Sequence, residues 1–148
     1  DSPCFKLKEH PEIDVEGQYV KLNVERYGGM IISSWMDRPL SVAGRVVVRE
    51  EGKLKTRLVD FKRDVCMIPS LANHMNRDGE QNQKTKIQKE MLPLYGSKTA
   101  AGSLLKEIAD CAGVRPEDIL GNDLFLYNRM KGPGLGSVRR IYFQWQTG

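Results

Sequence analysis

The chain has 148 residues, enough for one domain with a hydrophobic core, and its 40% hydrophobic and 28% charged residues are typical of a globular protein. No apolar run approaches the roughly 20 residues that a helix needs to cross a bilayer, so we do not expect this chain to be a membrane protein. The net charge of +4 suggests nucleic-acid binding, but acidic residues are interspersed with the basic ones, which favours a solvated surface of mixed charge.

Strands are predicted for most of the first two-thirds of the chain. Apolar and polar residues alternate in residues 5–8 and 19–24, a pattern that indicates strands with one buried face. Gly28-Gly29 interrupts this pattern before residues 30–35, an apolar run for which we expect an exposed apolar edge.

A tight hairpin is predicted between residues 45–49 and 53–58. Glu51-Gly52 separates the two runs, and glycine supplies the positive φ that such turns require. Residues 65–68 follow as a short strand that Pro69 ends, and the polar residues 76–90 predict an exposed loop.

The last third begins with a predicted amphipathic helix over residues 99–112. Gly113 suits the position just after a helix, and Pro116 suits the first position of a second short helical turn. Residues 123–127 return to a strand pattern. The elements together predict a β-rich α+β domain in which one or two helices pack on antiparallel strands.

The three cysteines are too widely spaced for a disulfide framework or a cysteine-based zinc site. Cys66 lies in an apolar run and Cys111 on the predicted helix, whereas Cys4 lies near the start. We therefore interpret them as reduced packing residues, which favours the cytosol.

Histidines are the first candidates for a site, and the chain has two. His10 lies in a polar, turn-like context and is expected at the surface. His74 lies where a packed strand gives way to a polar loop and could reach a ligand, although a histidine in such a place is more often structural. The residues alone offer no HExxH pair, no serine elbow and no set of zinc ligands.

Four blocks of sequence, in a constant order, resemble the aspartyl aminopeptidase family of zinc aminopeptidases. These blocks are residues 27–31 (YGGMI), 34–46 (SWMDRPLSVAGRV), 68–75 (IPSLANHM) and 123–129 (DLFLYNR). The resemblance covers residues 1–132, whereas residues 133–148 form a tail for which we find no counterpart.

The resemblance implies a subunit of two domains. A catalytic α/β domain binds two zinc ions, and an inserted β-rich domain, barrel- or sandwich-like, mediates dimer contacts within a dodecamer. The reaction removes N-terminal acidic residues from peptides through attack by metal-activated water. Residues 1–132 are then the inserted dimerisation domain with short flanks of the catalytic domain.

The resemblance also implies roles for two residues. His74 matches a histidine that projects into the active site of a neighbouring subunit, where it helps to bind substrate and to stabilise the transition state. Asp1 matches a carboxylate that orients a zinc-binding histidine two positions before it. The zinc ligands and the general base lie outside this chain, so we expect no metal bound to this span and no activity from the chain alone.

Two other hypotheses remain open from the residues. A non-catalytic assembly module would use exposed apolar edges around residues 30–35 and the aromatic stretch at the C-terminal end, whereas nucleic-acid binding rests on net charge alone. We therefore predict an oligomeric, cytoplasmic hydrolase that binds itself and peptide substrates. We expect it to bind neither nucleic acid nor membranes.

Overall fold

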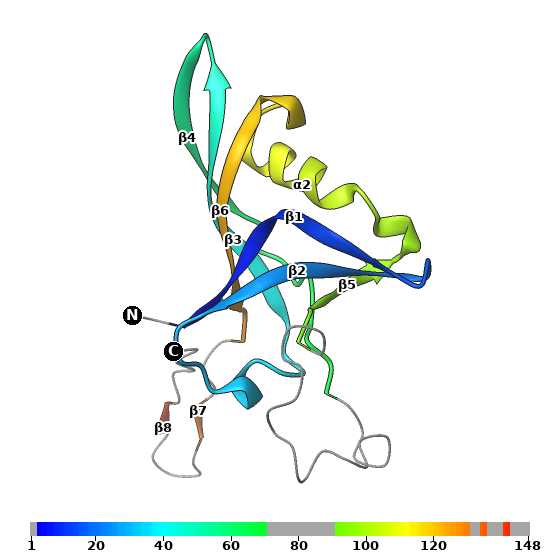
Figure 1. Cartoon of the computed structure of the whole chain (residues 1–148). Coiled ribbons are helices and arrows are strands. Elements are labelled where there is room, and N and C mark those ends of the chain that lie inside the picture. The colour runs from blue at the N-terminus through cyan, green and yellow to red at the C-terminus, as the bar shows by residue number, and fades with distance from the viewer. Residues whose placement is uncertain (1–2, 71–90, 131–133, 136–140, 143–148) are drawn as a thin grey trace.

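A six-stranded antiparallel sheet dominates the fold (Figure 1). The computed structural model describes residues 3–70, 91–130, 134–135 and 141–142. The strand order is β4-β3-β6-β1-β2-β5, and the short strands β7 and β8 pair separately. The strands are β1 (Cys4–Val15), β2 (Tyr19–Tyr27), β3 (Leu40–Glu50), β4 (Lys53–Asp60), β5 (Leu94–Ser97), β6 (Ile119–Asn128), β7 (Gly134–Leu135) and β8 (Ile141–Tyr142).

Helix α2 (Ser103–Ala112) covers one face of this sheet, and three 3-10 helices complete the described elements: η1 (Ile32–Ser34), η3 (Lys98–Ala100) and η4 (Pro116–Asp118). Leu104 and Ile108 of α2 belong to the same buried cluster as the inward-facing residues of β3 and β6. The burial of this apolar face is what holds the helix on the sheet. The β-rich α+β class is thereby confirmed, with an open sheet instead of a closed barrel.

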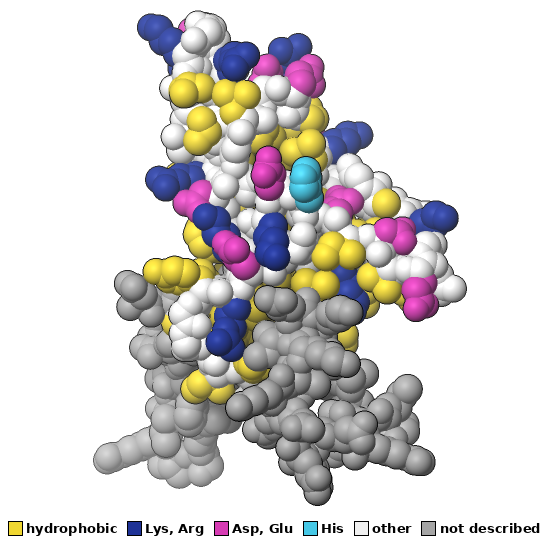
Figure 2. All heavy atoms as spheres, in the orientation of Figure 1, with side chains coloured by type: hydrophobic (Ala, Val, Ile, Leu, Met, Phe, Trp, Pro, Cys, Tyr) yellow, Lys and Arg dark blue, Asp and Glu magenta, His cyan; other side chains and the backbone are white. Residues whose placement is uncertain are grey.

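The edge of the sheet that β4 forms is exposed on both faces, because no further strand pairs with β4 in the sheet order. Leu54 and Leu58 of β4 keep 69% and 82% of their surface exposed, and Figure 2 shows hydrophobic side chains over this end of the molecule. Glu50 pairs with Lys55 at 2.8 Å and with Arg57 at 2.5 Å. The predicted mixed-charge surface is therefore built of ion pairs in this hairpin.

The β3–β4 hairpin is confirmed. Glu50 pairs with Lys53, and the two turn residues Glu51 and Gly52 have φ of 51° and 74°. Positive φ at both central positions is the geometry of the hairpin turn that glycine favours. The strands predicted around residues 5–8, 19–24 and 123–127 are also present, within β1, β2 and β6.

The prediction of an exposed apolar edge at residues 30–35 is wrong. These residues form η1 and its flanks, and Met30 and Trp35 are buried whereas Ile31 is exposed. The ring of Trp35 meets that of Phe5 edge to face at 5.1 Å. A large aromatic side chain gains more from this burial than a strand edge would gain from pairing.

For two other predicted elements, the structure changes the boundaries or the regularity. The helix begins at Ser103 and not near residue 99, because Gly102 has φ of 76° and separates α2 from η3. Its end at Gly113 and the proline that opens η4 are confirmed. Residues 65–68 pair through isolated bridges and not as a regular strand. The loop predicted at residues 76–90 lies outside the described residues.

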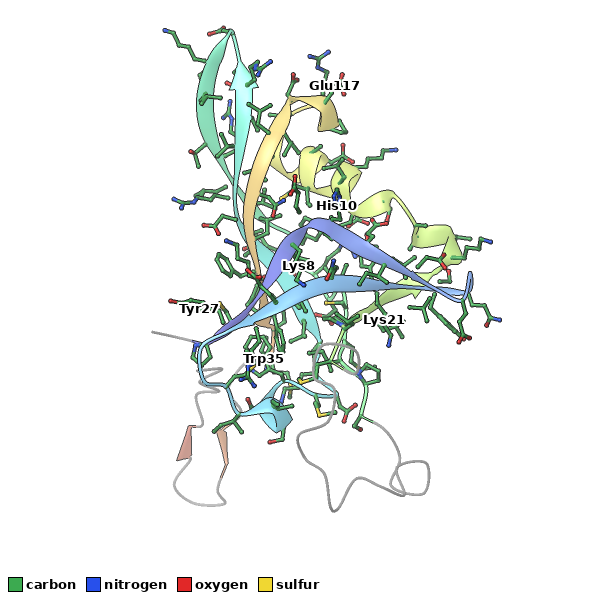
Figure 3. All side chains as sticks on the ribbon, in the orientation of Figure 1. Lys8, His10, Lys21, Tyr27, Trp35 and Glu117 are labelled. Atoms are coloured by element: carbon green, nitrogen blue, oxygen red, sulfur yellow. The ribbon has the colours of Figure 1, made fainter. Side chains whose placement is uncertain are left out.

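A wide bulge bends β1 toward α2. Leu7 pairs with Val24 and Glu12 with Leu22, so residues 8–11 stand opposite Asn23 alone. The bend places the Glu12 carboxylate at the start of α2, where it accepts hydrogen bonds from the backbone of Gly102 (2.5 Å) and Leu104 (2.8 Å). Gly102 offers no capping side chain, so the cap comes from β1. His10, in the bulge, is exposed as predicted (Figure 3).

All three cysteines are free. Cys66 is buried as predicted, and burial raises the pKa of its thiol to about 12. Cys111 lies on α2 but is exposed, so its predicted packing role is wrong. Its thiol donates a hydrogen bond to the carbonyl oxygen of Asp60, at the end of β4, at 3.4 Å.

The Gly44→Ala substitution should disrupt the centre of the sheet. A Cβ at residue 44 would lie 2.2 Å from the carbonyl oxygen of Asp123, and φ at Gly44 is +149°. We expect a loss of at least about 2 kcal/mol in the free energy of unfolding, measured by chemical denaturation. Gly29→Ala is the matched control, since a Cβ there meets nothing within 4 Å. Equal stability of the two variants would contradict the β3–β6 register.

Candidate functional site

Both residues singled out by the sequence, His74 and Asp1, lie outside the described residues. The chain on either side of them is described. Ser70 and Met91 flank residues 71–90, which include His74, and Pro3 follows Asp1 closely. Pro3 is buried, and its Cα would lie 3.3 Å from a Cβ added to Gly28. The described residues on either side form the framework of the candidate site.

Residues 65–68 form the central part of this framework. Val65 donates to the carbonyl oxygen of Leu40 at 2.8 Å, and Leu40 donates to that of Cys66 at 2.9 Å. On the other side, the backbone N–H of Leu94 donates to the Met67 carbonyl oxygen at 2.7 Å. The segment thus bridges the start of β3 and the start of β5 just before the chain reaches Ser70.

Asp37 attaches the end of this segment in two places. Its backbone N–H donates to the carbonyl oxygen of Ile68, and its carboxylate accepts a hydrogen bond from the backbone N–H of Ser70, both at 2.8 Å. The hydroxyl and the backbone N–H of Ser70 hold the pKa of the Asp37 carboxyl below its ordinary value. Hydrogen bonds to the charged form of a carboxyl have this effect because they stabilise the anion.

The buried side chains beneath this attachment make it rigid. Trp35 is 1% exposed and Ile68 is fully buried, and Met36 forms a parallel bridge with Ile68. Figure 3 shows Trp35 beside η1, at the end of the molecule from which Tyr27 also projects. The backbone of residues 35–37 therefore rests on the core, which fixes the position of the Asp37 carboxylate.

The described part of the chain does not fit a zinc site. No group of three or more His, Cys, Asp or Glu side chains in it is close enough to hold a metal ion. Its described helices include none that is long and apolar enough to cross a membrane.

Comparison with known proteins identifies the family. The model of the family described as "Aminopeptidase I zinc metalloprotease (M18)" matches residues 1–143. The chain belongs to the M18 family. The match extends into residues 133–148, the tail for which the sequence analysis finds no counterpart.

Curated M18 relatives are similar over nearly all of this chain. It is 45% identical to the "Probable M18 family aminopeptidase 2" of Clostridium acetobutylicum in an alignment 142 residues long that covers 92% of the chain and 33% of the relative. The protein of the same name from Clostridium novyi is 43% identical over the same shares. The chain thus spans about a third of the length of the curated relatives it matches.

Solved structures of M18 proteins share the fold. The Chaetomium thermophilum mApe1 structure superposes with a TM-score of 0.80 at 28% identity, over 92% of this chain and 34% of that one. A yeast structure described as the mApe1 dodecamer gives 0.69 at 25% identity, over 92% and 31%. The α+β fold described above is accordingly that of one part of the M18 subunit.

Sequence reasoning missed the pairing of Asp37 with Ser70. Both residues lie inside blocks that carry the family resemblance, but they are 33 positions apart, and nothing in their spacing indicates a contact. Asp37 has φ of 55°. A positive φ in a residue other than glycine is a signal of a special position that only the structure reveals.

The pH dependence of the Asp37 attachment can be measured directly. Its folded-state pKa is below the ordinary 3.8, so its contribution is complete above pH 3.8 and is lost as pH falls through the lowered value. In an NMR titration of the chain, we expect the Ser70 amide proton to shift with a midpoint below pH 3.8. A midpoint at or above that value would show that the carboxylate is not hydrogen-bonded as described.

Proposed function

We propose that this chain is part of a zinc-dependent aminopeptidase that removes N-terminal residues, preferably acidic ones, from peptides. The chain supplies self-association and a substrate-site histidine, and the metal centre comes from the rest of the subunit. The observation that carries this proposal is the M18 match over residues 1–143.

The domain assignment follows from the same proposal. Residues 1–132 form an inserted dimerisation domain with short flanks of the catalytic domain, and the expected separate tail is reduced to residues 144–148, because the family match reaches residue 143. The open edge at β4, with exposed Leu54 and Leu58, supports a role in self-association, because unpaired strand edges and apolar patches favour such contacts. The dodecamer of a yeast neighbour supports it as well.

His74 acts in the active site of a neighbouring subunit. A histidine that donates a hydrogen bond to the oxygen on which negative charge develops would bind the substrate and stabilise the transition state. The attachment of Ser70 to Asp37 supports this role, since it holds the chain four positions before His74. Asp1 orients a zinc-binding histidine that precedes it in the whole protein, as carboxylates beside metal ligands do.

The alternative is a non-catalytic assembly module that uses the same β4 edge. A catalytic partner domain in the same protein would decide between the two, and the relatives, about three times as long as the match, favour its presence. Zinc is then held in the full-length enzyme only, and the 148-residue chain by itself should be inactive. We further propose a cytoplasmic location, with no nucleic-acid or membrane partner.

The His74→Ala substitution tests the catalytic role in the full-length subunit. We expect kcat/KM for an acidic aminoacyl substrate to fall by about 10²-fold, the usual loss when one donor to a developing oxyanion is removed. His10→Ala is the matched control, because His10 is exposed on β1 and should leave activity unchanged. The proposal for His74 fails if the two variants are equally active.

Mixed oligomers test delivery between subunits. His74→Ala subunits are co-assembled with subunits that lack a zinc ligand, so that neither type has a complete site of its own. If His74 serves the neighbouring site, the mixture regains activity that neither parent shows. A mixture as inactive as its parents would mean that His74 acts within its own subunit or not at all.

A further inference from the structure

We infer that strand β4 pairs with β4 of a second copy of this chain, antiparallel and in a register centred on Thr56. This inference rests on the self-association proposed above, and it names the strand, the register and the side chains through which the two copies meet. The observations that carry it are the free edge of β4, the apolar side chains on one of its faces and the ion pairs on the other.

The backbone of β4 presents a regular row of hydrogen-bonding groups at the margin of the sheet (Figure 1). Its eight residues pair with β3 without a register shift, and no strand in the described part of the chain pairs with its other side. Glu50 pairs with Lys53 across the turn, and the backbone N–H of Phe61 donates to the carbonyl oxygen of Val42. The odd-numbered residues of β4 thus bond to β3, so the N–H and C=O groups of the even-numbered residues face the free edge.

The even-numbered residues also carry the apolar face of β4. Leu54 and Leu58 keep 69% and 82% of their surface exposed, and Val47, which lies opposite Thr56 on β3, keeps 36%. Because side chains alternate along a strand, these residues share one face, whereas Val59 joins the core cluster with α2 on the other. Figure 2 shows hydrophobic side chains over this end of the molecule. An exposed apolar edge strand with neither a proline nor a bulge is a template for pairing with another chain.

A two-fold axis through Thr56 matches the two copies along the whole strand. Leu54 of each copy then lies opposite Leu58 of the other, and Thr56 lies opposite its own copy. All three positions face the free edge, and each hydrogen-bonded pair exchanges two bonds, about six in all. A register centred on Lys55 or Arg57 would instead place a cation opposite its own copy and a leucine opposite a threonine.

The ion pairs on the other face make this register acceptable. It places Lys55 opposite Arg57 of the second copy, and like charges in opposite positions destabilise a strand pair. The Glu50 carboxylate lies 2.8 Å from the Lys55 ammonium and 2.5 Å from the Arg57 guanidinium. Hydrogen bonds from these two side chains hold the pKa of the Glu50 carboxyl below its ordinary value, so it remains ionised at neutral pH. Each copy therefore brings its own counter-charge to the pairing.

Disulfide cross-linking in the full-length subunit tests the register directly. Thr56→Cys places two thiols on the axis, with Cα atoms about 5.5 Å apart, within the roughly 4.4–6.8 Å that disulfides require. We expect mild oxidation to link these subunits in pairs through residue 56, as located by mass spectrometry of the cross-linked peptides. Lys53→Cys is the matched control, because the Cα of residue 53 lies about 20 Å from its copy in this register and should form no such link.

Exchange of the two leucines tests the same register without a thiol. Leu58→Glu alone, or Leu54→Lys alone, places a charge opposite a leucine at two symmetric positions. Each should raise the dissociation constant for the contact about tenfold, measured by analytical ultracentrifugation. The double variant with Leu54→Lys and Leu58→Glu places a lysine opposite a glutamate at both positions, so it should regain association. The two side chains are about 13 Å apart within one chain, so the recovery must come from the contact between copies.

Other results overturn the inference. Subunits that assemble as before but form no disulfide through residue 56 would exclude this pairing while leaving self-association intact, and so would a double variant weaker than either single one. An unsubstituted full-length subunit that stays monomeric at all concentrations would remove the proposed self-association and this inference together. If Thr56→Cys does not fold, recovery of association in the double leucine variant decides the matter.

Discussion

Backbone hydrogen bonds of residues 65–68 connect two strands that the sheet itself leaves far apart. β3 is second in the strand order and β5 is last, yet Cys66 is paired with Leu40 at the start of β3, and Met67 with Leu94 at the start of β5. These bonds hold one end of the open sheet together. The fully buried Ile68 follows these bonds. Two residues later, the backbone N–H of Ser70 donates to the Asp37 carboxylate.

We propose that this arrangement lets a domain whose described residues hold no cluster of metal ligands contribute to an aminopeptidase. A β-rich framework is stable where the core residues of β3 and β6 pack on α2, and it is exposed at the β4 edge. We propose that the exposed end serves assembly and that the end near Trp35 and Ser70 presents His74. The two roles occupy opposite ends of β3, which begins at Leu40 and ends at Glu50.

The sequence predicted the elements that depend on local chemistry. Alternating residues in β1 and β2, the Glu51-Gly52 turn and the αL glycine after α2 each follow from periodicity or from backbone preference, and all are present. The elements that depend on contacts distant in the sequence could not be found in this way. Trp35 is buried because Phe5 meets it, and Glu12 caps α2 because a bulge turns β1 toward it.

The candidate site shows the same difference between what local sequence patterns predict and what contacts between distant residues determine. The position of His74 between a strand and a polar loop made it a candidate, but its proposed role, like that of Asp1, came from the family resemblance. Asp37 lay within a recognised block, but its role depends on Ser70, a partner that only the fold brings to it. Local patterns therefore gave the framework, whereas contacts between residues distant in the sequence required the structure.

Hydrogen exchange of the full-length subunit, followed by mass spectrometry, tests most directly whether residues 65–68 hold the sheet together. The amides of Met67 and Leu94 should exchange as slowly as those in the paired centre of β3 and β6, because each donates to the carbonyl oxygen of the other. Exchange as fast as that of the exposed Glu51-Gly52 turn would contradict the account, since Ser70 would then extend from a segment that the core does not fix.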